Sequence, residues 1–396
     1  MSGIGMQKVL VICPSYGKSI EALSVHTKLM KQFFLRNYQV AVLTTAGLVS
    51  YDETESVQTH EQIIEVNGEW NFINLMKKTK EIRDFNPDKI FIQYVPFLYG
   101  RGGINFSFPL WVMLMRLLDK AKIEIYFHEL YYPFEMKIKS MVMNVSHIIM
   151  LFILGLSAHH ILVTTKAFEK ILRRIFFLKK YIHFLPVGPN IEKHRIDHNA
   201  CEEFRKKHNI SSVDLVLGSF GTFHPSKNYH LIFEILKKIK TKDKMPVKFI
   251  MIGQDRTDLL NYLGEDDFKQ LEDIVIATGS LNDSEINLAF AVMDAYLGYF
   301  MDGLSARRGS IMAAMQAGLP IISTISKTTE ECFVKQAQVY LYDPDENIFS
   351  DGVRELIKHY GYHIKKTGKI KHVVFEDFFA WEKIFQTYEK YNGEMK

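Results

Sequence analysis

The chain has 396 residues, enough for two or three domains of ordinary size, and 47% of them are hydrophobic, so it can bury substantial cores. A formal net charge of only +4, with 24% charged residues, excludes a disordered chain and predicts no nucleic-acid partner. The three cysteines, Cys13, Cys201 and Cys332, lack metal-ligand or disulfide-scaffold spacing, which favours a reducing compartment.

The N-terminal half alternates short apolar runs with helical patterns. Residues 1–17 lead directly into a strand-like run without the features of a signal peptide, so we expect a cytoplasmic location. Buried strands separated by helices of this length indicate βαβ units and a parallel sheet. The expected strands are Lys8–Cys13, Gln39–Thr45, Lys89–Val95, Ile123–Leu130, His159–Thr165 and Tyr181–Gly188, and the expected helices are Ile20–Asn37, Asn71–Asp84 and Phe106–Ala121.

Two stretches of this half raise the question of membrane contact. The uninterrupted apolar part of Met141–Ala158 is Ile148–Leu156, far short of the ~20 residues that a spanning helix needs. It is either a buried helix or a helix lying on a membrane surface. Lys166–Phe184 interleaves basic with apolar side chains, which is typical of a basic amphipathic element on an anionic membrane or of an edge helix with one solvated face.

The alternation then starts again and predicts a second parallel α/β domain. The polar, charged segment Pro189–Lys207 marks the break between the two. We therefore expect a first domain over residues 1–188, a linker over 189–207 and a second domain over 208–375. The expected strands are Asp214–Gly221, Val247–Gly253, Ile274–Gly279, Ala295–Phe300, Leu319–Thr324 and Val339–Asp343, and the expected helices are Tyr229–Lys240, Asp283–Val292 and Gly309–Gly318.

Ligands of open α/β sheets bind outside the carboxyl ends of the strands, so two such domains predict a cleft lined by the loops that follow strands. His128 and Glu129 directly follow a strand of the first domain, and histidine titrates near neutrality, so we predict a catalytic role for both. A satisfied structural histidine is the alternative. Arg101 lies in a glycine-rich aromatic loop and is either a ligand contact or ordinary loop polarity. The predicted acceptor-binding residues are Ser15, Tyr16, Gly17, Lys18 and Arg101.

Cations gather near two helix starts of the second domain. Lys227 stands near the start of a predicted helix, and Arg307 and Arg308 stand at the start of another. A cation is unfavourable at a helix N-terminus unless an anion binds there, and the arginine fork suits phosphate oxygens. The alternatives are a solvated lysine, and one exposed arginine with the other paired to Asp302. The predicted diphosphate-binding residues are Lys227, Arg307, Arg308, Gly309 and Ser310.

The order of these features resembles the GT-B fold glycosyltransferases, and among them the large family 4 exemplified by sucrose synthase and bacterial mannosyltransferases. The segments "FGTFHPSKN", "FIMIGQD" and "AMQAGLPIIST" carry the resemblance in the second half, and "IYFHEL", "HHILVTT" and "FLPVGPNIE" carry it in the first. The resemblance implies two Rossmann-like domains facing a cleft, with a last helix, residues 376–396, crossing back to the first domain. It also implies a donor bound mainly by the second domain and an acceptor bound mainly by the first.

The chain departs from the family pattern at the donor site. A Gly-Arg loop followed by a lysine holds the diphosphate in such enzymes; here Lys227 matches, but Thr222 stands in place of the arginine. The two family glutamates fall on Ser305 and Ala313. The sequence resembles instead a bacterial subgroup with Ser-x-Arg-Arg-Gly-Ser, and we infer that one of its two arginines supplies the missing charge. The donor sugar and nucleotide are expected at Gly221, Thr222, Gly253, Gln254, Asp302, Gly303 and Ser305.

We therefore expect a metal-independent glycosyltransferase that uses a nucleotide-sugar, needs no cofactor and, as the resemblance implies, retains the anomeric configuration. Its expected acceptor is a glycan, lipid-linked, in bacterial surface polysaccharide synthesis (O-antigen, lipopolysaccharide or capsule), with peripheral contact at the cytoplasmic face of the inner membrane. The alternative is an inactive GT-B-like binding subunit of a polysaccharide assembly complex, favoured by the missing glutamates and opposed by the converging cations. An epimerase on the same fold would need acidic and basic residues that we do not identify.

Overall fold

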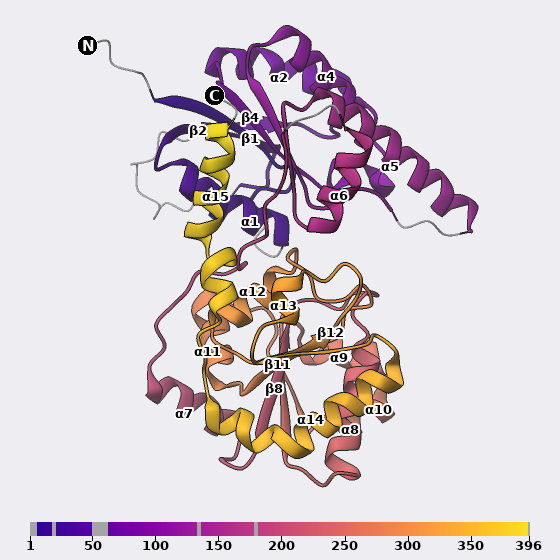
Figure 1. Ribbon diagram of the computed structural model, residues 1–396, viewed down its shortest axis with the longest axis vertical. Helices are drawn as coiled ribbons and strands as arrows, with labels where there is room; N and C mark the ends of the chain where they lie inside the picture. Colours follow the sequence, from indigo (N-terminus) through magenta and orange to yellow (C-terminus); the bar gives the residue numbers. More distant parts are fainter. Residues whose placement is uncertain (1–5, 18–20, 50–61, 133–135, 178–180, 395–396) are drawn as a thin grey trace. The chain divides into compact units, whose positions relative to one another are not determined.

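The chain divides into two compact α/β units, each built on one parallel sheet (Figure 1). The first unit comprises Met1–Pro186 with Ile384–Lys396, and the second comprises Val187–Lys383. The predicted α/β fold class is confirmed. The structure is a computed structural model that describes residues 6–17, 21–49, 62–132, 136–177 and 181–394.

The first unit holds a seven-stranded sheet in the order β3-β2-β1-β4-β5-β6-β7, with each neighbouring pair parallel. Its strands are runs of buried side chains, as expected for a sheet covered on both faces. The strands are β1 (Gln7–Ile12), β2 (Tyr38–Thr45), β3 (Gln62–Val66), β4 (Lys89–Tyr94), β5 (Lys122–Phe127), β6 (His160–Val163) and β7 (Ile182–Phe184). The helices are α1 (Ala22–Phe34), α2 (Phe72–Phe85), α3 (Pro96–Tyr99), η1 (Arg101–Gly103), α4 (Ser107–Leu118), α5 (Ile138–Ser157), α6 (Lys166–Ile175) and the greater part of α15 (Trp381–Glu394).

Alternate side chains of these strands pack against different helices. Leu10 and Ile12 of β1 join one core cluster with buried side chains of α2, α4 and α5. On the other face, Phe91 of β4 contacts Phe34 of α1 and Tyr388 of α15, with ring centroids 5.2 and 5.7 Å apart. Residues from Ile384 onward therefore complete one face of the first sheet.

The second unit holds a six-stranded sheet in the order β10-β9-β8-β11-β12-β13, again with each neighbouring pair parallel. The order reverses between β8 and β11, which is where doubly wound sheets bind ligands. The strands are β8 (Leu215–Phe220), β9 (Val247–Ile252), β10 (Val275–Ala277), β11 (Ala295–Gly298), β12 (Ile321–Thr324) and β13 (Val339–Tyr342). The helices are α7 (His198–Lys207), α8 (Tyr229–Thr241), α9 (Arg256–Leu263), α10 (Glu265–Leu271), α11 (Asp283–Val292), α12 (Gly309–Gln316), α13 (Glu331–Val334), α14 (Glu346–Thr367) and the π-helical turn η2 (Phe375–Phe379).

Residues 189–207, predicted as a linker, lie within the second unit and end in α7, which packs against α11. Hydrogen bonds fix the segment before this helix: the backbone N–H of Glu192 donates to Asp283 over 2.8 Å, and Asn287 donates to the carbonyl of Glu192 over 2.8 Å. These polar residues satisfy each other against α11, so a charged, proline-containing composition here forms an ordered edge of the second unit.

Candidate functional site

In the loop between β8 and α8, the ammonium group of Lys227 lies close to the backbone of Gly221. Gly221 has φ of +117°, and a side chain there would place its Cβ 2.7 Å from the Lys227 ammonium. The same loop is tied to its neighbours by hydrogen bonds from the N–H of Gly221 to Ile252 and from that of Lys227 to His224, over 3.0 and 2.8 Å. The backbone conformation therefore favours glycine at 221, and the absence of a side chain lets the lysine ammonium lie close to the backbone.

The predicted arginine pair lies at the start of α12 and shares one carboxylate. Arg307 and Arg308 each donate from Nη2 to a different oxygen of Asp302. The Arg308 side chain is 15% exposed, and its guanidinium lies 4.4 Å from the centre of the Phe300 ring. Stacking and the ion pair together hold the planar group in one orientation at the end of β11. Both arginines pair with Asp302, whereas the alternative raised by the sequence had one arginine exposed and only the other paired with Asp302.

Positive charge exceeds negative charge in this cluster. Burial opposes the ionised form of Asp302, but Arg308 and Arg307 outweigh it and hold the pKa of its carboxyl below the ordinary value. Burial, with the charge of Arg308 added, lowers the pKa of Lys227 to about 8. Lys227, Arg307 and Arg308 bring three positive charges together, and Asp302 pairs with the two arginines. Such a cluster favours an anionic ligand.

A carboxylate that sequence reasoning missed supports the arginine loop. Glu330 is 3% exposed, and its Oε2 accepts a hydrogen bond from the backbone N–H of Ala306 over 2.8 Å. Ser305, where the resemblance places one of the two family glutamates, is 2% exposed. Glu330 lies after β12, about 25 residues away along the chain, so no spacing in the sequence links it to this loop. The family pattern of two glutamates gave no signal for it.

The other predicted donor residues lie on loops at the same edge of the second sheet. Gly253 follows β9 with φ of +97°, and a Cβ there would touch the backbone of Gly221 at 3.5 Å, so the two glycine loops are in contact. Gln254 is buried and donates to the carbonyl of Gly253. Gly303 has φ of +77° and packs against Ser326. Thr222 is exposed, whereas Gly309 and Ser310 begin α12 and are partly buried.

In the first unit, His128 lies at the carboxyl edge of β5 within a buried polar cluster. Its Nε2 lies 2.6 Å from Oε1 of Gln93, and Nε2 of Gln93 lies 3.3 Å from Nδ1 of His26. The ring of Tyr126 packs on His128 with centroids 4.4 Å apart. Burial lowers the pKa of His26 to about 3 and that of His128 well below its ordinary value, with His26 adding to the shift at His128. Both imidazoles are therefore neutral at neutral pH.

The predicted acceptor residues divide into buried and exposed positions. Ser15 and Tyr16 are 2% and 7% exposed, and Gly17, with φ of +102°, packs closely against the carbonyl of Leu48. The Arg101 side chain is 96% exposed and lies 3.7 Å from Glu69. Lys18 lies outside the described residues. Glu129 is partly exposed next to His128. The assignment of these residues to an acceptor or to catalysis stays a prediction.

Among the described residues, no group of three or more histidine, cysteine, aspartate and glutamate side chains is arranged to hold a metal ion.

Comparison with known protein families gives a match within the second unit. Residues 214–359, from the start of β8 into α14, match the family described as "Glycosyl transferases group 1". Curated protein sequences give no match to the chain.

Solved structures match over almost the whole chain. HepE of Anabaena, crystallised with UDP and glucose, matches with a TM-score of 0.71, 13% identity and coverage of 98% of this chain and 100% of HepE. Sucrose-phosphate synthase of Thermosynechococcus elongatus matches with a TM-score of 0.71, 15% identity and coverage of 98% of each chain. WaaG, a glycosyltransferase involved in lipopolysaccharide biosynthesis, matches with a TM-score of 0.65, 13% identity and coverage of 97% and 100%. At these identities the likeness establishes the fold.

Proposed function

We propose that this chain, which has the GT-B fold and whose residues 214–359 match the group 1 glycosyl transferases, transfers a sugar from a nucleotide-diphosphate donor to a glycan. The observation that carries the proposal is the cluster of three cations, Lys227, Arg307 and Arg308, in which the two arginines share one carboxylate, that of Asp302. The diphosphate of a nucleotide-sugar supplies the negative charge that this cluster lacks. HepE, which shares the fold, was crystallised with UDP-glucose, so a UDP-sugar is the first donor to test.

The second unit binds the leaving diphosphate in this proposal. Negative charge grows on the bridging oxygen as the glycosidic bond to the donor breaks, and fixed cations at that edge stabilise it without reorganisation. Lys227, Arg308 and the N-terminus of α12 carry this role, so the reaction needs no metal ion. As in the family that the sequence resembles, the sugar keeps its anomeric configuration, which NMR of the product would test.

The first unit binds the acceptor and presents His128. Because the carboxamide oxygen of Gln93 can only accept, Nε2 of His128 carries the proton. The neutral ring then offers Nδ1 as an acceptor for a hydroxyl group of the substrate. A neutral imidazole orients the sugar without adding positive charge beside the developing oxocarbenium ion.

The acceptor in this proposal is a lipid-linked glycan at the cytoplasmic face of the inner membrane, in O-antigen, lipopolysaccharide or capsule synthesis. WaaG, of the same fold, is involved in lipopolysaccharide biosynthesis. In the first unit, α6 carries Lys166, Lys170 and Arg174 outside the ion pair of Glu169 with Arg173. Basic side chains that form no ion pair within the described part of the chain, on a short amphipathic helix, suit a surface that meets anionic lipid.

Thermal unfolding with UDP-, GDP- and dTDP-sugars and the free nucleotides tests the proposed donor site. We expect saturable stabilisation by one nucleotide series, growing with the logarithm of its concentration. Lys227→Met and Arg308→Gln should each raise the nucleotide concentration needed for a given stabilisation at least tenfold. Each variant removes a charge-assisted contact worth ~1.5–3 kcal/mol. Lys335→Met is the matched control, because Lys335 is 75% exposed and pairs with Glu331 on α13 of the same unit. Absence of a shift with every nucleotide would overturn the assignment.

A further inference from the structure

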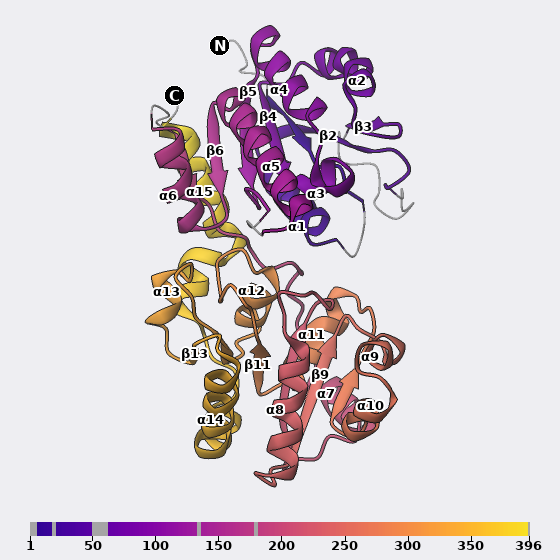
Figure 2. The ribbon, with the colours of Figure 1, turned by 90° about the vertical axis from the view of Figure 1, so that its right-hand side faces the viewer.

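One face of the first unit presents an apolar stripe that runs along two neighbouring helices. The helices α4 and α5 pack against each other (Figure 2), and both carry exposed apolar side chains. On α5 the spacing of three and four residues places them on a single face. The stripe consists of Leu110, Leu117 and Leu118 of α4 and of Ile138, Met141, Val142, Val145, Ile148, Ile149, Phe152 and Leu156 of α5, each at least 42% exposed.

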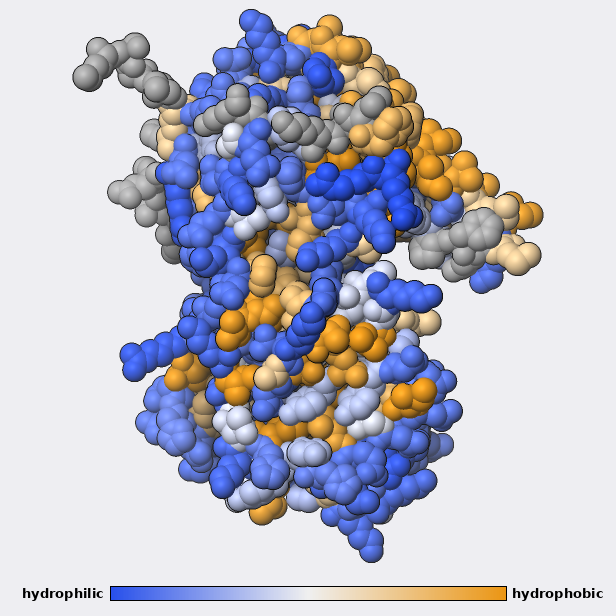
Figure 3. Space-filling view, in the orientation of Figure 1, coloured by the Kyte–Doolittle hydropathy of each residue, from blue (hydrophilic) through white to orange (hydrophobic). Residues whose placement is uncertain are grey.

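The stripe forms a continuous surface rather than scattered exposed residues. Figure 3 shows hydrophobic residues gathered along α5, next to a strongly hydrophilic band at α6. Neither α4 nor α5 contains an aspartate or a glutamate. Patches of this extent on soluble proteins mark a partner surface or a membrane surface.

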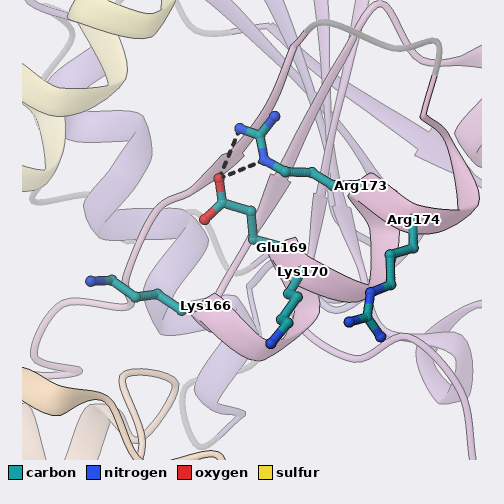
Figure 4. A pocket seen from close by; sticks show the side chains of 5 residues that line it. All are labelled: Lys166, Glu169, Lys170, Arg173 and Arg174. Atoms are coloured by element: carbon teal, nitrogen blue, oxygen red, sulfur yellow. Dashed lines mark hydrogen bonds and ion pairs between the residues drawn. The ribbon is translucent and has the colours of Figure 1, made fainter.

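Basic side chains border the stripe. Phe176, directly after α6, stacks on Phe152 with ring centroids 5.7 Å apart and packs on Gly155, so the end of α6 is fixed to α5. The side chain of Glu169 pairs with Arg173 over 2.9 Å, and Lys170 and Arg174 point away from this pair (Figure 4). The charge beside the stripe is therefore positive, which is complementary to anionic headgroups.

The opposite face of α5 holds the loops that follow β4 and β5. Nδ1 of His147 accepts a hydrogen bond from the backbone N–H of Tyr132 over 3.0 Å, and Asn144 donates to the carbonyl of Tyr132 over 2.5 Å. Met150 accepts from the backbone N–H of Asn105 over 3.3 Å. The helix that carries the apolar stripe is thus also the support of the segment that begins at His128.

We propose that the stripe of α4 and α5 enters the interface of an anionic bilayer while Lys166, Lys170 and Arg174 bind headgroup phosphates, so that α5 holds the His128–Tyr132 segment at the membrane surface. The functional role of this arrangement rests on the proposed function, because a lipid-linked acceptor is located at the membrane. The binding itself does not depend on a donor or an acceptor and is measured without either.

By length and composition α5 could cross a membrane, but half of its apolar stretch is buried within the first unit. Asn144 and His147 lie in that buried half and hold Tyr132. A spanning helix would have to give up these contacts and expose both polar groups to hydrocarbon. The helix therefore lies in the interface with one face in lipid.

Co-sedimentation of the full chain with vesicles tests the docking surface. We expect binding to phosphatidylethanolamine vesicles with about 30% phosphatidylglycerol, strong at low salt, and weak binding to pure phosphatidylcholine. Phe152→Glu and Ile149→Glu should each reduce partitioning on the order of tenfold, and Lys170→Gln with Arg174→Gln by about fivefold per removed charge. Ile348→Glu is the matched control, since Ile348 of α14 is 55% exposed in the second unit. We expect it to bind like the unchanged chain.

Three outcomes would overturn the proposal: no binding to anionic vesicles, equal binding by the stripe variants, or a dimer in solution that Phe152→Glu dissociates. The last result would show that a second copy covers the stripe. Nucleotide stabilisation of the same variants separates this proposal from the enzymatic one, since Phe152→Glu should bind donor normally while losing vesicle binding.

Hydrogen exchange on vesicles tests the link to His128. The N–H of Tyr132 should exchange more slowly when the chain is bound, because ordering α5 strengthens its bond to His147. In Asn144→Ala this protection should fall while α5 itself stays protected. If the variant does not fold, the unchanged chain still decides: protection of α5 without protection at Tyr132 would overturn the link.

Discussion

Gln93 fixes the tautomer of His128. Its side-chain oxygen lies 2.6 Å from Nε2 of His128, and its side-chain nitrogen lies 3.3 Å from Nδ1 of His26. The glutamine is fully buried, at 0% exposure, whereas His128 is partly exposed. One amide thus sets which nitrogen carries the proton in two histidines that burial keeps neutral. We infer that Gln93 positions His128 without touching the substrate.

Replacing Gln93 with leucine should release this tautomer. In the unchanged chain, nitrogen NMR of labelled histidine should show His128 with its proton on Nε2, and in Gln93→Leu a mixture of both forms. Donor turnover should fall on the order of tenfold, as expected for a loss of ~1.4 kcal/mol from one buried hydrogen bond. KM for the donor should change little, because the change affects orientation and not the diphosphate contacts.

Gln93→Glu separates positioning from simple packing. A carboxylate against Nε2 favours the imidazolium and should raise the pKa of His128 from its buried value, so that turnover gains a new ionisation between pH ~5 and ~7. The unchanged chain should show no histidine ionisation in that range. If turnover of both variants keeps the pH profile of the unchanged chain, Gln93 has only a structural role.

Lys227 should destabilise the protein when no ligand is bound. Its folded pKa of about 8 lies below the ordinary lysine value, so its charged form is disfavoured in the folded state. Lys227→Met should therefore raise the free energy of unfolding at pH 7 by roughly 1–2 kcal/mol, since a pKa unit is worth ~1.4 kcal/mol. The gain should shrink as pH rises from about 8 toward 10.5, where the folded lysine is already neutral. Urea unfolding at pH 7 and pH 9.5 measures this.

The same variant should lose nucleotide stabilisation, so stability and binding change in opposite directions. Lys335→Met again serves as a control that should change neither quantity, because that lysine is exposed at the surface. A fall in the stability of Lys227→Met at pH 7 would contradict the assignment of Lys227 as a strained cation awaiting an anion.

Most strands and helices could be predicted from the sequence because each carries its own periodicity. The apolar runs of β1, β2, β4 and β8 are buried on both faces, and such runs are unambiguous when glycine or charged residues bound them. The edge strand β3 was missed because it is only partly buried and contains Glu65. The long helix α14 was missed because its apolar face is diluted by charged residues and by two glycines, Gly352 and Gly361.

The candidate site could be predicted only where its residues follow strands whose loops meet at one edge of the sheet. Lys227 and the arginine pair follow strands, and the parallel topology brings their loops to one edge. The pairing of both arginines with one aspartate depends on side-chain rotamers, which spacing does not determine. Gln93 and Glu330 act across about 25 to 35 residues of sequence, and as single buried polar residues they leave no pattern.

Stability should fall steeply in mild acid. Burial lowers the pKa of His26 to about 3 and, with the charge of His160 added, that of His183 to about 4. The unfolded chain takes up these protons near pH 6.5 and the folded chain does not, so each histidine should cost up to ~1.4 kcal/mol per pH unit below 6.5. Urea unfolding between pH 7.5 and 4.5 should show this slope, reduced by one proton in His183→Asn. Stability that is constant or rises toward pH 5 would contradict it.

A buried ion pair secures the C-terminal helix α15 to the first sheet. The Lys89 ammonium lies 2.9 Å from Oε1 of Glu124, and the Tyr388 hydroxyl donates to the other oxygen of Glu124 over 2.6 Å. Burial acts against this carboxylate, but Lys89, His160 and Tyr388 together hold the pKa of Glu124 at about 2. Its contribution to stability is thus complete above about pH 4.5 and is lost as pH falls toward 2.

Removing one partner of this pair should cost far more than removing both. Glu124→Leu leaves the Lys89 charge buried without compensation, and we expect a loss of ~3–5 kcal/mol in the free energy of unfolding. Lys89→Met combined with Glu124→Leu should recover most of that loss, because an apolar pair needs no compensating charge. Tyr388→Phe should lower the free energy of unfolding by only ~1–2 kcal/mol, since Phe34 and Phe91 still hold the ring. Because the hydroxyl no longer bonds to Glu124, proteolytic release of α15 should nevertheless be faster. Urea unfolding and limited proteolysis measure the three variants together with the unchanged chain. A double variant no more stable than Glu124→Leu would show that the charges themselves hold α15 in place.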